Sequence, residues 1–376
     1  MRQKGNFYIP LVGLLLAAFA FGALALAAAG AGSGGMAAGP RNDWRLGEGV
    51  TYENLTVFPV FARLGVDTSG FVTLDEALAS GDAVVTERGS EIIRRSRDGR
   101  PIPIQQGASV NQLVLINRGA KPLVLLAGEV VSGGKQDRVI AKDRIVPPGA
   151  EPLPLDVFCV ERGRWTGGSA QFLSSTVIVH PSVREKAVVE QKQDEVWAAV
   201  RSGTTARVSA DAAPAALAGG VVAGVIASEA QSESYAKIYK GSRVGQSVEA
   251  FATEFERRFA RIPREKGDQL IGVVVAYGGE VAWADVFASQ AMFDRYWSKL
   301  LRSYVVEALA RPQTKERASL DDAREFLEPL KGRENTESEP GVYRWRQVTE
   351  GRYAEIALDA LPKGLTLHWV KILRTS

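Results

Sequence analysis

Residues 269–312 read QLIGVVVAYGGEVAWADVFASQAMFDRYWSKLLRSYVVEALARP, and this stretch predicts two strands followed by a long helix. The apolar runs 269–276 and 280–288 flank Tyr277, Gly278 and Gly279, which is turn chemistry of the kind that joins antiparallel strands. From Ser289 to Pro312 the apolar residues are spaced three and four apart, the pattern of a capped helix with one buried face. A hairpin next to such a helix indicates an α+β fold.

The part of the chain before this stretch, residues 44–181, has a β-rich pattern. Short apolar runs alternate with turn residues, and the runs 112–117 and 122–127 predict a further hairpin. One short helix is expected at 74–80, ended by Gly81. Several short strands at this spacing predict an antiparallel β-sandwich-like half or a half-barrel.

Residues 182–376 are expected to form a helix-rich half with additional antiparallel strands, and this half can share one core with the preceding one. Helix caps are expected at Ser182, Ser247, Ser289 and Ser319. Residues 203–231 are rich in Ala and Gly and predict an irregular insertion that can contain a weak helix. The charged segment after the Ser319 helix, up to residue 340, is interpreted as a solvated loop. Closing strands are expected at 343–348, 352–358 and 365–373.

The first 32 residues predict a signal peptide or an N-terminal membrane anchor. Arg2 and Lys4 precede an uncharged run, 7–32, which is as long as a spanning helix but has small residues suited to cleavage at its end. Residues 33–43 are expected to be a flexible linker. The positive charge ahead of the run places the body outside the cytoplasm, either periplasmic or extracellular or anchored to the membrane. Membrane contact is expected through this segment if it is not cleaved.

Composition narrows the possible functions. The chain has 376 residues, of which 45% are hydrophobic and 24% charged, as in an ordinary globular protein. Its formal net charge of +3 provides no field suited to nucleic acid, so no nucleic-acid partner is expected. Cys159 is the one cysteine and there are two histidines, which gives neither a disulfide nor a zinc signature. The sequence indicates no particular cofactor and no metal ligands, although carboxylate-bound calcium or magnesium sites need no fixed spacing.

The segment 128–138 is the first candidate site. Glu129, Gly133, Gly134, Lys135, Gln136 and Arg138 lie in one connection between expected strands. Glycines let backbone N–H groups approach an anion, and Lys135 and Arg138 can neutralise it. The alternative is a glycine bulge in which Glu129 pairs with Arg138 and fixes the strand register.

The segment 159–165 is the second candidate. Glu161, Arg164 and Trp165 follow a strand and can present an acid, a planar cation and a stacking ring together. The alternative is that the ring folds over the sheet edge while the charges are solvated. Cys159 itself falls on the apolar face of the strand, which favours a core residue with an inert thiol.

Asp285 is the third candidate. In the alternating pattern it shares a face with Val281, Trp283 and Phe287, and a carboxylate among such residues must be paired or have a raised pKa. Pairing with the start of the following helix is the structural alternative. His180 and His368 can act as bases, but neither has an acid or nucleophile nearby in the sequence.

Two stretches together resemble a known family. Residues 125–129, 134–138, 146–149 and 159–165, followed by 284–288 and the long helix, are similar to the ARG and rhodanese-phosphatase-superfamily-associated protein domain, a domain of unknown function. The resemblance runs from about residue 55 to the C-terminus. The family name implies association with ADP-ribosylglycohydrolases and rhodanese-like phosphatases, and so nucleotide or ADP-ribose chemistry nearby. The export segment and the Ala/Gly-rich stretch depart from that context.

Three functions follow from the sequence. The first is a noncatalytic ligand-binding module of the cell envelope, which recognises an anionic small molecule or glycan through Glu129, Lys135, Gln136, Arg138, Glu161, Arg164, Trp165 and Asp285. The second is a hydrolase in which Glu161 or Asp285 acts as acid or base while Lys135 and Arg138 stabilise negative charge. The third is a structural or protein-interaction protein of the envelope whose charged residues are solvated.

Overall fold

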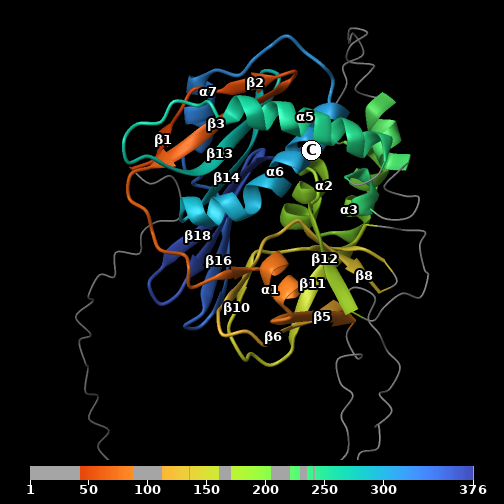
Figure 1. The fold of residues 1–376 in the computed structure, drawn as a ribbon, viewed down its shortest axis with the longest axis vertical. Coiled ribbons are helices and arrows are strands. Elements are labelled where there is room, and N and C mark those ends of the chain that lie inside the picture. Colours follow the sequence, from red (N-terminus) through yellow and green to blue (C-terminus); the bar gives the residue numbers. More distant parts are fainter. Residues whose placement is uncertain are drawn as a thin grey trace, which may run out of the picture. The chain divides into compact units, whose positions relative to one another are not determined.

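The computed structural model describes residues 43–87, 112–134, 136–160, 171–204, 221–228, 235–239 and 242–375. Helices and antiparallel strands occur in both predicted halves, so the α+β prediction is confirmed (Figure 1). The expected signal or anchor segment and the linker lie outside the described residues, as does most of the stretch 203–231, of which 221–228 is helical. Within the described ranges no helix combines the length and apolarity that crossing a membrane requires.

A nine-stranded antiparallel sheet contains the residues of the opening stretch. Its strand order is β1-β3-β13-β14-β18-β17-β16-β15, and β2 pairs with β3 beside this path. The predicted hairpin of β13 and β14 and the three closing strands are confirmed. The strands are β1 (Arg45–Leu46), β2 (Val50–Tyr52), β3 (Leu55–Ala62), β13 (Gln269–Tyr277), β14 (Glu280–Phe287), β15 (Arg333–Glu339), β16 (Tyr343–Glu350), β17 (Tyr353–Ala360) and β18 (Leu365–Leu373).

Two details of this sheet differ from the predictions. Residues 333–339 are the edge strand β15 instead of a solvated loop, because backbone pairing with β16 needs no apolar side chains and nearly all of this strand is exposed. A register shift in the β13–β14 hairpin breaks the alternation of β14, so Val281 packs on the opposite side from Trp283 and Phe287.

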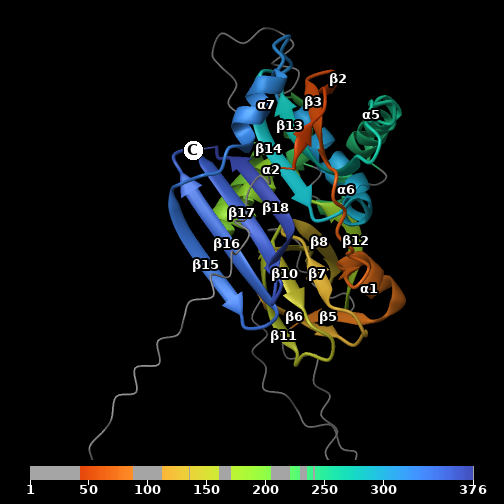
Figure 2. The same ribbon diagram turned by 90° about the vertical axis from the view of Figure 1, so that its left-hand side faces the viewer.

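Helices cover both faces of the sheet (Figure 2). α5 (Arg243–Phe259) and α6 (Gln290–Ala310) pack on one face within the largest apolar cluster, and α7 (Leu320–Leu327) packs on the other face. The caps at Ser289 and Ser319 are confirmed. The cap predicted at Ser247 is wrong: α5 begins one turn earlier, where Ser242 accepts a hydrogen bond from the Gly245 amide at 2.8 Å.

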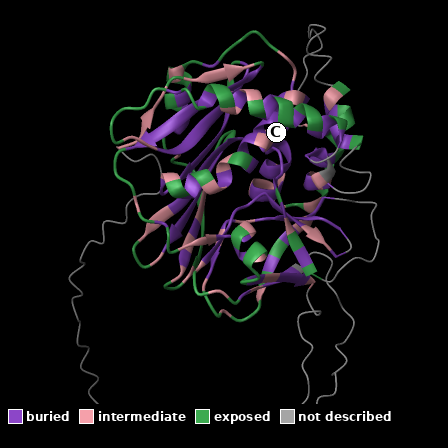
Figure 3. Ribbon diagram, in the orientation of Figure 1, coloured by how far each residue is buried: buried purple, intermediate pink, exposed green. Residues whose placement is uncertain are grey.

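Six strands of the N-terminal part close into a barrel in the order β11-β6-β5-β12-β8-β9. A small sheet, β10-β7-β4, and the helix α1 lie against it, and their apolar residues share one cluster. Figure 3 shows burial along the inner strands and along the helix sides that face them. The bounds are β4 (Val72–Thr73), α1 (Leu74–Ser80), β5 (Ala83–Glu87), β6 (Gln112–Asn117), β7 (Leu123–Leu125), β8 (Glu129–Gly133), β9 (Arg138–Ile140), β10 (Arg144–Val146), β11 (Leu153–Cys159) and β12 (Gln171–Ile178).

In this part of the chain the sequence predicts the helix α1 correctly and the pairing of β6 incorrectly. α1 has the predicted bounds, with a capping box at Thr73 and Gly81 in the left-handed conformation at φ 78°. The hairpin predicted from 112–117 and 122–127 does not form, because β6 pairs with β5 and β11 while β7 pairs with β10 and β4. The turn between them directs the chain out of the barrel, and turn residues alone do not select a strand's partner.

The cap predicted at Ser182 is wrong, because the helix begins at Pro181, directly after His180, and this helix is divided into three segments. α2 (Pro181–Glu185) continues as a π-helix (Lys186–Glu190), and α3 (Gln193–Ser202) follows. Gln191 interrupts the helix with a left-handed φ of 54°, and Gly203 ends α3 in the predicted left-handed conformation. The first segment brings Arg184 into the interior, where it is buried.

Candidate functional site

The described residues of the predicted site are buried. Glu129 at the start of β8 is 2% exposed, and Gln136 and Arg138 are also buried. The Arg138 Nη1 group donates to the Gln136 side-chain oxygen and to the Asp137 carbonyl, each at 3.3 Å. Lys135, Glu161, Arg164 and Trp165 lie outside the described residues.

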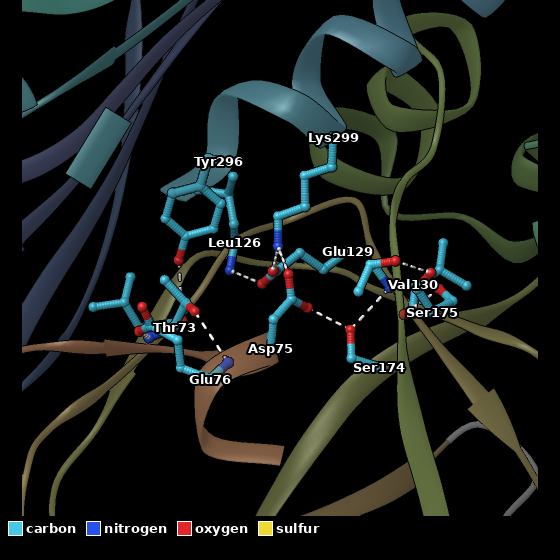
Figure 4. A network of polar contacts seen from close by, with 12 residues as sticks. Thr73, Asp75, Glu76, Leu126, Glu129, Val130, Ser174, Ser175, Tyr296 and Lys299 are labelled. Atoms are coloured by element: carbon cyan, nitrogen blue, oxygen red, sulfur yellow. Dashed lines mark hydrogen bonds and ion pairs between the residues drawn. The ribbon is translucent and has the colours of Figure 1, made fainter. Parts of the chain in front are cut away.

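The Glu129 carboxylate belongs to a charge network beneath α6. One oxygen accepts a hydrogen bond from the Leu126 amide at 2.7 Å, and the other forms an ion pair with Lys299. The Lys299 ammonium also donates to Asp75 of α1 at 2.7 Å (Figure 4). Asp75 in turn accepts a hydrogen bond from the Ser174 hydroxyl of β12. Two carboxylates from different elements therefore share one ammonium group.

Burial and neighbouring charges shift the pKa values of Glu129 and Lys299 in opposite directions. Burial raises the pKa of Glu129 above its ordinary value, and Lys299 offsets part of that shift. Burial acts to lower the pKa of Lys299, but Glu129 and Asp75 together raise it above its ordinary value. Lys299 is consequently held as a cation at neutral pH.

A pocket of about 330 Å³ opens at this network, and we call it the Lys299 pocket. Arg295, Lys299 and Arg302 of α6 line it from one side of the helix, because residues four and three positions apart share a helix face. Its remaining lining comes from Asp75, Thr176, Val177, Tyr239, Glu249 and Ser298. This volume falls within the range of small-molecule sites.

The two arginines at the pocket hold exposed carboxylates. Arg302 binds Glu249 of α5 through two hydrogen bonds of 2.6 and 2.7 Å, and the Glu249 side chain is 48% exposed. Arg295 lies 3.6 Å from Glu76, whose side chain is 46% exposed. Exposed ion pairs contribute only about 0.2–1 kcal/mol. A ligand anion can therefore replace these carboxylates at small free-energy cost.

Thr176 adds backbone strain at the pocket. Its φ is 56°, and it lies where the register of β12 against β8 shifts. A β-branched residue in the left-handed region is an outlier that costs on the order of 1–3 kcal/mol, and such residues cluster at functional sites. The strain is therefore an independent observation that points to the same place as the charges.

Asp285 lies in a different network at the junction of the large sheet and the barrel. Its two oxygens accept hydrogen bonds from Arg184 at 2.8 and 3.0 Å, from Trp283 at 2.8 Å and from the Tyr304 hydroxyl. The fourth partner is His368, whose Nε2 lies 2.9 Å from Asp285 and whose Nδ1 lies 2.5 Å from Asp143. The partner is thus not the start of the following helix, since Tyr304 lies well inside α6.

The Asp285 network is buried and closed to solvent. Burial alone would raise the pKa of Asp285, but Arg184 and His368 hold it well below its ordinary value. Burial acts to lower the pKa of His368, and Asp143 and Asp285 raise it above 6.5. A carboxylate with five donors and a depressed pKa is poorly suited to give or take a proton, so this geometry does not favour Asp285 as a general acid or base.

Cys159 and His180 occupy apolar or closed surroundings. Cys159 is buried, and its backbone exchanges two hydrogen bonds of 2.8 Å with the Gln193 side chain. Burial lowers the pKa of His180, whose Nδ1 lies 2.6 Å from the Tyr235 hydroxyl. Across the described ranges, no group of three or more His, Cys, Asp or Glu side chains is arranged to hold a metal ion.

Sequence reasoning missed Lys299, Arg184 and Asp143. One signal for Lys299 existed, because it falls in the buried stripe of α6 between Tyr296 and Ser303. A charged residue within an apolar helix stripe indicates a buried partner. That partner, Glu129, lies 170 positions away in the sequence. No pattern near Lys299 in the sequence indicates which residue it pairs with.

Comparison with protein families shows a match over most of the chain. The family model described as the ARG and rhodanese-phosphatase-superfamily-associated protein domain matches residues 43–370. Neither the curated proteins nor the solved structures gave a match.

Proposed function

The chain belongs to the ARG and rhodanese-phosphatase-superfamily-associated protein domain family, and we propose that it binds a small anionic molecule in the Lys299 pocket without converting it. The observation that carries this proposal is the convergence of Arg295, Lys299 and Arg302 on one cavity of about 330 Å³. On the lining, these three cations face two carboxylates, those of Asp75 and Glu249. A carboxylate, phosphate or uronic-acid group on the ligand would take the place of Glu76 or Glu249 on the two arginines.

The arrangement supports binding through a fixed cation and two adaptable ones. Lys299 is anchored by Glu129 and Asp75, so its position is set before a ligand arrives. The guanidinium groups of Arg295 and Arg302 are partly exposed and can exchange Glu76 and Glu249 for ligand oxygens. Ser298 and Thr176 supply hydroxyls at the same lining, which suits a polyhydroxylated ligand such as a sugar acid.

Noncatalytic binding fits this pocket better than hydrolysis does. Asp75 and Glu249 are engaged with cations, and an acid catalyst needs a proton that it can deliver to the ligand. Glu129 has the raised pKa of a candidate acid, but it is 2% exposed and lies beneath Lys299. The charged groups of the pocket are therefore suited to binding one another and a ligand, and not to transferring a proton.

Titration calorimetry of the full-length chain tests the proposal. The probes are inorganic phosphate, citrate, ADP-ribose and glucuronate, with glucose as the uncharged match to glucuronate. We expect at least one anion to bind, and Arg295→Gln and Arg302→Gln each to weaken it by about ten- to a hundredfold, since hydrogen bonds to charged groups contribute about 1.5–3 kcal/mol.

Arg257→Gln is the matched control, because Arg257 is also a helix arginine paired with a carboxylate, here Glu254 of α5, outside the pocket lining. It should leave the affinity unchanged. Binding of glucose as tight as that of glucuronate, or anion binding that survives both pocket substitutions, would contradict an anion site here.

We also propose that the chain is exported, on the strength of the basic start and uncharged run in residues 1–32. The body would then meet its ligand outside the cytoplasm. Cell fractionation followed by N-terminal sequencing tests this: recovery in the envelope or medium supports export, and the first residue found separates a cleaved signal from a retained anchor. Recovery of the whole chain in the cytosol would contradict it.

A further inference from the structure

The two arginines of the Lys299 pocket are held apart by the helix that carries them. Arg295 and Arg302 line the pocket from one face of α6. They are seven residues apart, which at the rise of an α-helix separates their backbones by about 10 Å along the axis. Every Cα–Cβ bond of a helix tilts toward its N-terminus, so both side chains start in the same direction. The two guanidinium groups therefore belong to different ends of the cavity.

Separate contacts anchor these two groups. Arg295 donates from Nη1 to the Phe71 carbonyl at 2.9 Å, just before β4. Arg302 donates from Nη1 to the carbonyl and the hydroxyl of Ser298, at 3.0 and 2.7 Å, on α6 itself. Neither guanidinium group can swing toward the other without losing these hydrogen bonds. Two separate cationic positions are thus set before a ligand arrives.

Each guanidinium group already holds a carboxylate of the protein. Glu76 of α1 lies 3.6 Å from Arg295, and Glu249 of α5 binds Arg302 through two hydrogen bonds. In both ribbon views α6 lies between α1 and α5 (Figure 1 and Figure 2), so the two carboxylates approach the helix from opposite sides. The chain therefore places its own pair of well-separated carboxylates on the two arginines.

The middle of the pocket leaves no positive charge uncompensated. Lys299 lies between the two arginines on α6, but its ammonium group is already paired with Asp75 and Glu129. The third hydrogen of this ammonium group can still donate to a neutral oxygen. The uncharged residues of the lining are Thr176, Val177, Tyr239 and Ser298. This part of the pocket therefore suits a neutral section of a ligand.

From this arrangement we propose that the ligand is an elongated dianion with one acidic group at each end and a neutral middle, an inference that rests on the anion binding proposed above. One end replaces Glu76 on Arg295, and the other replaces Glu249 on Arg302. Long dicarboxylates and acidic disaccharides belong to this class. A compact anion such as inorganic phosphate reaches one arginine at a time and binds more weakly.

Calorimetry of the full-length chain with three matched probes tests the inference. Azelate is a long dicarboxylate, its monomethyl ester has the same length but one acidic group, and succinate has both groups on a short chain. We expect azelate to bind about ten- to a hundredfold more tightly than its ester, since it gains one more hydrogen-bonded ion pair. Azelate should also bind more tightly than succinate. An affinity of the ester or of succinate equal to that of azelate would overturn the proposal.

Substitution of the arginines shows whether both ends are used. Arg295→Gln and Arg302→Gln should each bring azelate and its monomethyl ester to the same affinity, because one arginine remains in either variant. Arg257→Gln, outside the pocket lining, should keep the full preference for azelate. A preference that persists in either pocket variant would refute binding by both arginines. If a variant does not fold, the three probes with the wild type still decide the matter.

Removal of an internal carboxylate tests the exchange itself. Glu249→Gln should tighten azelate by about two- to fivefold, the amount that an exposed ion pair contributes. Glu254→Gln is the control, since Glu254 is another α5 carboxylate paired with arginines and lies outside the lining. Equal affinities in the two variants would contradict the exchange.

The two proposals fail in different ways. If no anion binds, the function proposed above is wrong and this inference falls with it. If anions bind but azelate shows no advantage over its ester, only the dianion inference is wrong.

Discussion

The Lys299 and Asp285 networks are built from the same kinds of residue but differ in how they meet solvent. Both hold buried carboxylates against a cation and both include residues of α6. The Arg184 and Asp285 side chains are 2% and 0% exposed, whereas Asp75, Arg295 and Arg302 are each between 23% and 26% exposed. A closed network can only hold elements together, while an open one can exchange an internal partner for a ligand.

Asp285→Asn should give the largest effect on stability. The substitution leaves Arg184 and His368 with an uncompensated buried charge, and breaking such a pair costs about 3–5 kcal/mol of unfolding free energy. Urea unfolding measures it. Asp321→Asn is the control, because Asp321 is 88% exposed in its pair with Arg324 and should change stability by at most about 1 kcal/mol. Equal effects of the two substitutions would break the distinction between closed and exposed pairs.

Lys299→Met should have a smaller effect, about 2–3 kcal/mol. Asp75 is 26% exposed and can turn to water, and Glu129, with its raised pKa, can take up a proton when the ammonium is lost. The same unfolding experiment at two pH values sharpens the comparison, since lower pH should reduce the cost of this substitution by protonating Glu129. A cost as large as that of Asp285→Asn, unchanged with pH, would show that the Lys299 network is closed as well.

His368 gives the Asp285 network a defined dependence on pH. Its folded pKa is raised above 6.5, so its stabilising contribution is fully present below that value and is lost as the pH rises through the raised folded pKa. Asp285 acts at the acid end, where its depressed pKa means that stability falls as the pH drops below about 3.8.

The difference in unfolding free energy between the wild type and His368→Gln isolates the contribution of His368. We expect this difference to shrink as the pH increases above 6.5. Measuring the difference matters because burial lowers the pKa of His180, and this second histidine changes wild-type stability in the opposite direction over the same range. A difference that is constant with pH would mean that His368 is neutral in the folded protein.

Thr176→Gly should have the smallest effect and the opposite sign. Glycine adopts a positive φ freely, so removal of the strain, less the entropy cost of glycine, should stabilise the fold by about 1 kcal/mol. Thr336→Gly in the exposed strand β15 is the control and should destabilise by about 0.5–1 kcal/mol. Stabilisation by Thr176→Gly would confirm the strain beside the Lys299 pocket, whereas destabilisation would remove strain as an argument for function.

Sequence patterns predicted the positions of helices and strands far better than they predicted which strands pair and which side chains meet. α1, α6, α7 and the β13–β14 hairpin follow from capping residues and from periods of 3.6 and 2, which depend on neighbours along the chain. The pairing of β6 and the edge strand β15 were missed because pairing depends on strands elsewhere in the fold. For the site, the sequence correctly singled out Glu129 and Asp285 as unusual, but it joined them in one surface that the structure divides into two buried networks.

The sequence by itself determined the fold class and the family, because both depend on composition, local periodicity or the order of motifs along the chain. Only the tertiary structure decided which charges meet. Glu129 and Lys299 are 170 positions apart, and Arg184 and Asp285 are 101 positions apart. Whether such a pair is closed or opens on a cavity depends on how helices and sheets pack around it, and packing is a property of the whole folded chain.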